Sequence, residues 1–129
     1  MTTTAPQQTL TSGHVGINGD QRYAFLGSGG TLLVTLWEQS QGVFDAGLPG
    51  LHHLALQVPD AEAVTAAQQR LRDAGATFLH DGVRAHAEGG DSGGIWFTDP
   101  DGTRLEVYTS AGLTGVASAT PGAPTCGFF

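Results

Sequence analysis

The chain has 129 residues, the length of a single domain, and 40% of them are hydrophobic, which suits a globular core. Its formal net charge is −7 and its five basic residues are unclustered arginines, so binding to nucleic acid or to an anionic membrane surface is not expected. No apolar run reaches the ~18–20 residues of a transmembrane helix, and Met1 to Ser12 lacks the basic and apolar regions of a signal peptide.

The chain contains one cysteine, Cys126, which has no partner for an internal disulfide. The fold must therefore be held together by burial of apolar side chains, with help from a metal ion or from oligomerisation. A chain without disulfides suits a reducing compartment, and we expect a cytoplasmic protein.

The first part of the chain is predicted to contain strands only. Residues 1–11 are rich in Thr and Gln and are predicted to form a flexible tail. A first strand is predicted over 13–18, and residues 23–26 and 31–38 are predicted to form a hairpin across the Gly/Ser-rich turn 27–30.

A strand followed by a helix is predicted next. Residues 51–58 alternate between aliphatic and other side chains, as strands do, and Pro59 ends the strand. Asp60 is suited to cap the N-terminus of a helix, and Gly75 is suited to cap its C-terminus. Between them, apolar residues recur at helical spacing and form one stripe. The stripe consists of Val64, Ala67, Leu71 and Ala74.

Three further strands are predicted over 76–80, 95–98 and 103–109. The segment 80–94, rich in Gly, Asp and Ser, is predicted to be a loop, and the run 99–102 is a Pro/Gly turn. The second half of the chain therefore has the order β-α-β-β-β.

The predicted elements make one domain over residues 12–110. It contains a shortened first module, residues 12–40, and a complete second module, residues 51–110. Residues 111–129 are rich in Gly, Ala, Thr and Pro and are predicted to form a flexible tail.

Polar side chains on three strands suggest a metal site. Alternate residues of a strand face opposite sides, and this divides each of the three strands into an aliphatic face and a polar face. The polar faces carry His14, His53 and Glu106. Two imidazoles and a carboxylate are a ligand set for Fe(II), Mn(II), Ni(II), Co(II) or Zn(II). The alternative is three ordinary polar residues on solvent-facing sides of strands, because the sequence alone does not make distant strands neighbours.

Two runs carry a family resemblance: residues 51–58, LHHLALQV, and residues 94–108, GIWFTDPDGTRLEVY. They resemble the vicinal oxygen chelate superfamily, which includes glyoxalase I, bleomycin-resistance proteins, fosfomycin-resistance thiol transferases and extradiol dioxygenases. The resemblance implies an α+β fold in which paired β-α-β-β-β modules form an open, cup-shaped sheet around a divalent metal ion. By position, it implies that His14, His53 and Glu106 are the metal ligands, with His52 as the rival of His53.

The chain departs from the family pattern in its first module. A helix and one strand are missing after Asn18, where only four residues precede the hairpin. The position of a fourth ligand, used by glyoxalase I-like enzymes, is taken by Val34 or Leu36, while Glu38 has the right phase but lies farther along. The chain is therefore similar to three-ligand relatives. The missing helix leaves one face of the first sheet uncovered. Either a partner subunit, in the homodimer that the resemblance implies, or a rearranged N-terminal strand would then cover it.

Other polar residues are candidates for contact with a small-molecule substrate. His86, on the loop before 95–98, could act as a general base, or belong to a solvated polar loop. Tyr108 and Arg104 share the face of Glu106 and could take part in catalysis and in binding an anionic group, respectively. Gln57 and Asn18 are candidate pocket residues.

The resemblance implies a metal-dependent enzyme that acts on a small molecule chelated through vicinal oxygens. Lyase or isomerase, ring-cleaving dioxygenase and thiol transferase chemistries all fit this description. The alternatives are a metal-free protein that sequesters a small molecule, as bleomycin-resistance proteins do, and a degenerate member of the family without activity.

Overall fold

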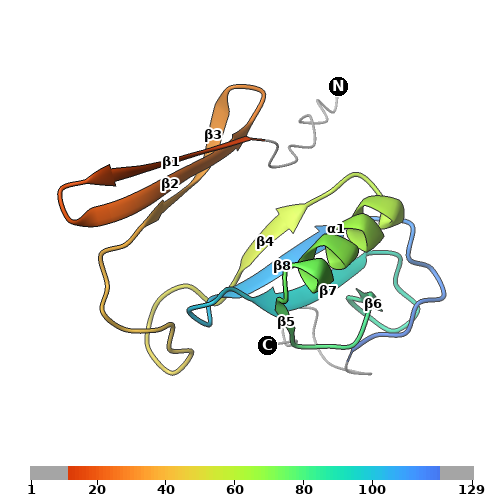
Figure 1. Ribbon diagram of the computed structural model, residues 1–129. Helices are drawn as coiled ribbons and strands as arrows, with labels where there is room; N and C mark the ends of the chain where they lie inside the picture. The colour runs from red at the N-terminus through yellow and green to blue at the C-terminus, as the bar shows by residue number, and fades with distance from the viewer. Residues whose placement is uncertain (1–11, 120–129) are drawn as a thin grey trace. The chain divides into compact units, whose positions relative to one another are not determined.

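The structure, a computed structural model, describes residues 12–119. The chain divides into two compact units, residues 1–42 and 43–129 (Figure 1), and each unit is described by itself. In the described residues the first unit consists of strands, and the second combines strands with one helix. The α+β fold class predicted from the sequence is confirmed.

The first unit is an antiparallel sheet of three strands in the order β1-β2-β3. These are β1 (Ser12–Asn18), β2 (Gln21–Ser28) and β3 (Thr31–Trp37), which confirms the three predicted strands. The turn between β2 and β3 has positive φ angles at both Gly29 and Gly30, +56° and +80°. Such angles define the tight two-residue turn that glycine permits without steric cost.

The link between β1 and β2 is equally short. Asn18 pairs with Gln21 across a two-residue turn, in which Gly19 has a φ of +64°. The helix and strand expected in a complete module are therefore replaced by this turn.

The two faces of the first sheet differ in character. One face is aliphatic, and Val15 and Ile17 on it are each 73% exposed. The other face carries rings: the centroid of Tyr23 lies 4.8 Å from that of Phe25 and 5.2 Å from that of Trp37. Among the described residues of this unit, 12–42, no helix covers the aliphatic face.

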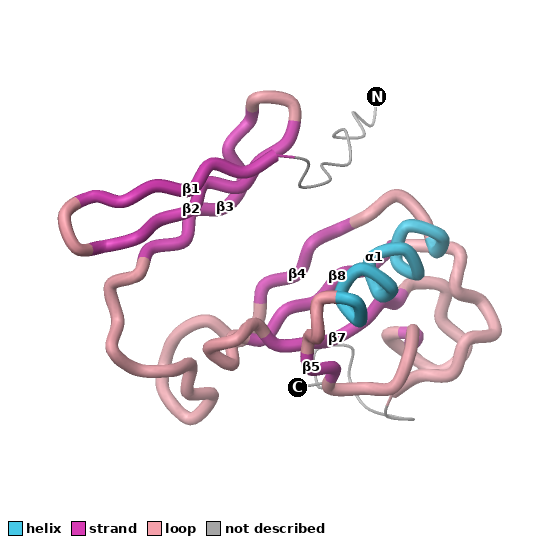
Figure 2. The backbone as a smooth tube through the Cα atoms, in the orientation of Figure 1, coloured by secondary structure: helices cyan, strands magenta, loops and turns pink. Residues whose placement is uncertain are grey.

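The second unit is built on a five-stranded mixed sheet (Figure 2). Its main path is β4 (Leu54–Gln57), β8 (Arg104–Thr109), β7 (Gly93–Thr98) and β5 (Thr77–Phe78), and β6 (Arg84–Ala85) also pairs with β7. Strands β4 and β8 are parallel, whereas the remaining pairs are antiparallel. The pairing of β4 with β8 thus brings together the first and last strands of the predicted module.

Helix α1 (Ala61–Asp73) packs on one face of this sheet, against β7 and β8. As predicted, Asp60 caps its N-terminus: the side-chain Oδ1 accepts a hydrogen bond from the backbone N–H of Ala63 at 2.8 Å. Gly75 follows its C-terminus with a φ of +77°. The stripe of α1 and the aliphatic sheet face form the core, whose buried members are Val64, Ile95, Phe97 and Val107. No helix within residues 12–119 is long and apolar enough to cross a membrane.

Two segments differ from the predictions. Strand β4 begins at Leu54, so His52 and His53 precede it, and the predicted loop 80–94 contains β6 and the first residues of β7. A strand of only two residues lacks a periodic pattern, which is why alternation could not reveal β6.

The segment after β8 also differs from the flexible tail that we predicted from residue 111. Its described part, up to residue 119, returns to the second unit, where Leu113 and Ser118 are buried and Ser118 forms a bridge with Ala85. The spacing of hydrophobic residues could not predict this, because Leu113 is an isolated buried side chain and backbone hydrogen bonds hold the rest of the segment. Cys126 and its neighbours lie outside the described residues.

Asp91 is the main anchor of this segment. Its Oδ1 accepts hydrogen bonds from the hydroxyl of Thr114 at 2.7 Å and from the backbone N–H of Gly112 at 2.9 Å. The Thr114 hydroxyl, followed by the Gly112 N–H, lowers the pKa of Asp91 below its usual value, since both stabilise the carboxylate.

The anchor is expected to weaken in acid. A carboxyl group with a lowered pKa in the folded state stabilises the fold above its unfolded pKa of about 3.9, and this contribution disappears as the pH falls through the folded pKa. Asp91→Ala should therefore lower the melting temperature at pH 7, and the difference from wild type should shrink below about pH 4. Melting followed by circular dichroism from pH 7 to pH 3 measures this, with exposed Asp81→Ala as control. A difference that is independent of pH would contradict the assignment.

Candidate metal centre

Glu106 lies at the centre of the sheet face opposite α1. It pairs in register with Ala55 on β4 and with Trp96 on β7. Its neighbours Leu105 and Val107 point to the helix side and pack in the core, so alternation along β8 directs the carboxylate to the other side. Glu106 is only 5% exposed. A buried carboxylate is costly unless it is paired, so its partners define the site.

Two imidazoles face this carboxylate, one at each oxygen. Nε2 of His86 lies 2.5 Å from Oε1 of Glu106, and Nε2 of His53 lies 3.4 Å from Oε2. The His53 and His86 side chains are 23% and 15% exposed, respectively, so His53 is the more accessible of the two.

Each imidazole is held at its other nitrogen. Nδ1 of His53 lies 2.7 Å from Nδ1 of His52, and Nδ1 of His86 lies 2.9 Å from the hydroxyl oxygen of Ser92. Histidines that bind metals through Nε2 are commonly fixed in this way through Nδ1, because the second contact sets the tautomer and the ring orientation. His53 rather than its rival His52 is therefore the residue that faces Glu106.

Aromatic rings pack around His86. The Trp96 ring, which is 1% exposed, has the edge of His86 at a centroid distance of 5.6 Å and that of His80 at 5.8 Å. The Tyr108 ring lies 5.7 Å from His86 on the other strand. These contacts hold the loop histidine against the sheet.

The candidate substrate residues of the second unit lie on the neighbouring strands β4 and β8. The hydroxyl of Tyr108 donates to Oε1 of Gln57 at 3.4 Å, and Nε2 of Gln57 contacts the hydroxyl of Ser110 at 3.5 Å. Arg104 is half-buried near the start of β8, opposite Thr98 on β7. Tyr108 and Gln57 are thus brought together, as register predicts for neighbouring parallel strands.

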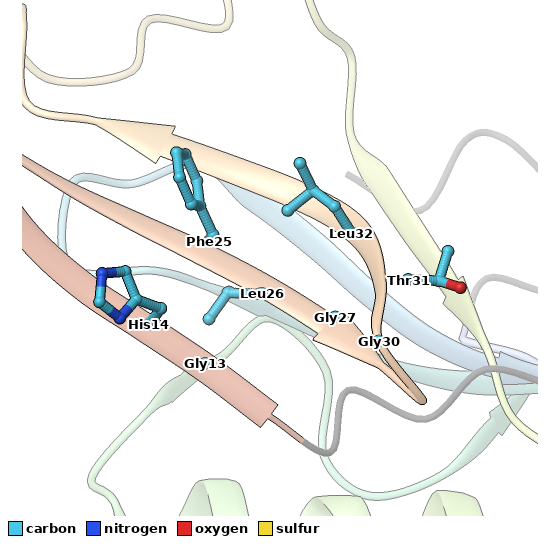
Figure 3. A pocket seen from close by; sticks show the side chains of 8 residues that line it. All are labelled: Gly13, His14, Phe25, Leu26, Gly27, Gly30, Thr31 and Leu32. Carbon is cyan, nitrogen blue, oxygen red and sulfur yellow. The ribbon is translucent and has the colours of Figure 1, made fainter.

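The remaining candidates belong to the first unit. His14 lies on β1 opposite Phe25, its ring centroid is 6.1 Å from that of Tyr23, and its side chain is exposed. Figure 3 shows His14 among the residues that line a hollow on the three-stranded sheet. Asn18 is exposed at the end of β1.

Glu38, considered above as a fourth ligand, is paired with Arg22 in the first unit. Its carboxylate accepts two hydrogen bonds from the guanidinium, and this contact lowers the pKa of Glu38 and raises that of Arg22. The pair gives Glu38 a structural partner on the sheet.

The chemistry of the donors in the second unit fits a divalent ion. A buried carboxylate with an imidazole Nε2 on each side supplies the oxygen and nitrogen donors that Fe(II), Mn(II), Ni(II), Co(II) and Zn(II) accept. Within residues 12–119, however, no group of three His, Cys, Asp or Glu side chains is arranged to hold a metal ion. The arrangement offers a pair of candidate ligands, His53 and Glu106, to which further ligands must be added.

In the second unit, strand β4 is followed by helix α1 and then by the remaining strands of one sheet, whose polar face lies opposite the helix. A family model described as "Glyoxalase/Bleomycin resistance protein/Dioxygenase superfamily" matches residues 8–107, and the chain belongs to this superfamily.

A solved structure supports the fold. It is described as the "glyoxylase/bleomycin resistance protein/dioxygenase domain from Frankia sp. EAN1pec", and it is similar to this chain with a TM-score of 0.58 and 23% identity. The similarity covers 81% of this chain and 77% of that chain. A search among curated proteins found no match.

Proposed function

We propose that the chain is a metal-dependent enzyme that acts on a small molecule chelated through two neighbouring oxygens. His14, His53 and Glu106 are the proposed ligands of the ion. The observation that carries the proposal is the pairing of a buried carboxylate, Glu106, with the more accessible imidazole of His53. A divalent ion bound there would act as a Lewis acid toward the oxygens of the substrate.

Residues around the proposed ligands supply the other functions that such an enzyme needs. Tyr108 is half-buried on the face of Glu106 and is our candidate for proton transfer. Arg104 would bind an anionic group of the substrate, because a guanidinium can grip a carboxylate through two parallel hydrogen bonds. Gln57 and Asn18 are the proposed polar contacts that orient the substrate.

We also propose that the protein is a homodimer. The exposed aliphatic face of the first unit, with Val15 and Ile17, supports this because exposed apolar surface is stabilised by burial against a partner. A dimer also allows His14 of one protomer to serve the site of the other.

A metal-free binding protein is the second candidate function. The ring cluster around Tyr23 and the 43% exposed Trp37 on the first sheet favour it, because exposed rings can stack on a planar ligand. If the chain binds no metal, a metal-free binding protein becomes the favoured function over a metal-dependent enzyme.

The test is the metal content of the purified chain after reconstitution with Fe(II), Mn(II), Ni(II), Co(II) or Zn(II), measured together with the solution mass. We expect about one ion per chain with one of these metals, and His53→Ala and His14→Ala should each lower the affinity by at least about 10-fold, because each removes a ligand. A solution mass of two chains is expected. No bound ion under any of these conditions would overturn the enzyme proposal.

A further inference from the structure

Glu106 has a different relationship with each of its two imidazole neighbours. A hydrogen bond from a ring N–H to a carboxylate has an N···O distance of about 2.7–2.9 Å, and few such bonds exceed about 3.2 Å. The contact from His86, at 2.5 Å, is shorter than this range and is the closer of the two. The contact from His53, at 3.4 Å, is too long for a good hydrogen bond. The two histidines therefore hold different places around one carboxylate.

The distance between His53 and Glu106 can be compared with the distance between two ligands of one metal ion. Two ligands at about 2.1 Å from one ion lie roughly 3.0 Å apart at an octahedral angle and roughly 3.4 Å apart at a tetrahedral angle. The separation of His53 and Glu106 has this size, whereas the separation of His86 and Glu106 is too small for two ligands of one ion. His86 is thus spaced as a donor to the carboxylate, and His53 is spaced as its companion ligand.

His86 is itself firmly held. Its Nδ1 contacts the Ser92 hydroxyl at 2.9 Å, and its backbone N–H donates to the Ser92 carbonyl oxygen at 2.9 Å. The edge of its ring lies against buried Trp96. Both ring nitrogens are therefore engaged inside the protein, and the ring has a fixed position from which to act on Glu106.

We propose that His86, backed by Ser92, is a positioning residue: its Nε2–H holds Oε1 of Glu106, so that Oε2 is presented beside Nε2 of His53 for the metal ion. The sequence alone suggested a general base at His86, and the contacts give it this role instead. The inference rests on the proposed metal site, and it adds residues to that site which the family resemblance did not supply. Partners that orient a ligand in this way typically account for about 10–100-fold in metal affinity.

Two substitutions at His86 separate positioning from coordination. In His86→Gln, the amide nitrogen can reach the place of Nε2 and donate to Glu106, whereas His86→Leu fills the space without any donor. A glutamine amide is a poor replacement for an imidazole ligand of a transition metal, so it restores positioning but not coordination.

The experiment measures the affinity of the full-length protein for Co(II), in competition with a fluorescent chelator, for wild type, His86→Gln, His86→Leu and Ser92→Ala. Positioning predicts about 10–100-fold weaker binding for His86→Leu, a smaller loss for Ser92→Ala, and affinity within about 3-fold of wild type for His86→Gln. Circular dichroism melting checks that each variant is folded.

Pulsed electron paramagnetic resonance of the Cu(II)-loaded protein counts the coordinated imidazoles. The same count in wild type and His86→Leu supports positioning. A count lower by one in His86→Leu, or a loss in His86→Gln as large as in His86→Leu, would assign His86 to the ion as a ligand and overturn the inference. Equal Co(II) affinity in wild type and His86→Leu would also overturn it. Wild type that binds neither metal would overturn the proposed function together with this inference, a pattern distinct from failure at His86 alone.

Discussion

Glu106→Gln is expected to remove the divalent metal from the protein, with a loss of affinity of at least about 100-fold, because even the outer partners of metal ligands account for up to about this factor. The substitution keeps the size of the side chain and replaces one carboxylate oxygen by an amide nitrogen, so it removes the negative charge that attracts the ion. The amide can still accept a hydrogen bond from His86, and the metal-free protein should therefore keep its melting temperature within a few degrees. Elemental mass spectrometry of the dialysed protein gives the metal content.

Glu62→Gln is the matched control for this substitution. Glu62 is an exposed residue in the first turn of α1, on the opposite side of the sheet from Glu106. It undergoes the same chemical change, and its metal content should equal that of wild type. A Glu106→Gln protein that retains about one ion per chain would remove Glu106 from the proposed ligands, since a neutral amide oxygen does not replace a carboxylate here.

Trp96→Ala is expected to cause the largest loss of stability, about 3–5 kcal/mol of the free energy of unfolding. Trp96 is 1% exposed and pairs with Glu106 in the central strands, so its removal leaves a cavity in the sheet face that carries the site. It also removes the surface against which His80 and His86 pack by their ring edges. Since domains are stable by only about 5–15 kcal/mol, the variant should unfold at markedly lower urea concentration.

The other tryptophan of the chain provides the comparison. Trp37 on β3 is 43% exposed, and its main ring neighbour is Tyr23 at a centroid distance of 5.2 Å. Trp37→Ala should therefore lower the free energy of unfolding by clearly less than Trp96→Ala does, because much of the Trp37 side chain is already in contact with solvent. Urea unfolding followed by far-ultraviolet circular dichroism compares the two variants. An equal loss of free energy of unfolding in the two variants would contradict this prediction. It would show that Trp37 contributes more to stability than its exposed fraction indicates.

Local patterns in the sequence predicted the elements that depend on neighbours along the chain. The helix from Ala61 to Asp73 follows from its capping aspartate and its apolar stripe, and the phase of β8 follows from alternation, which directs Leu105 and Val107 to the core and Glu106 to the opposite face. The run 94–108 was specific enough to indicate the superfamily, which the family match confirms. These are short-range regularities, and each is contained in a single stretch of chain.

Other features depend on residues that are distant in sequence. The strand β6 and the packing of Leu113 and Ser118 were missed because two-residue strands and single hydrogen bonds leave no periodic signal. The place of His86 was missed for the same reason: its loop shows that it is polar, but not that its Nε2 reaches Glu106 twenty residues later.

The sequence by itself therefore determined which residue types could carry the chemistry and which face of each strand they occupy. Only the tertiary structure decided which of these residues lie close together. Alternation along a strand predicts the face of the sheet on which a side chain lies, but it does not predict which strand is paired beside it. Pairing of β8 with β4 and β7 sets Glu106 beside Ala55 and Trp96, and the loop between β6 and β7 adds His86. The distances of 2.5 Å and 3.4 Å, on which the proposed roles of His86 and His53 rest, arise at this level alone.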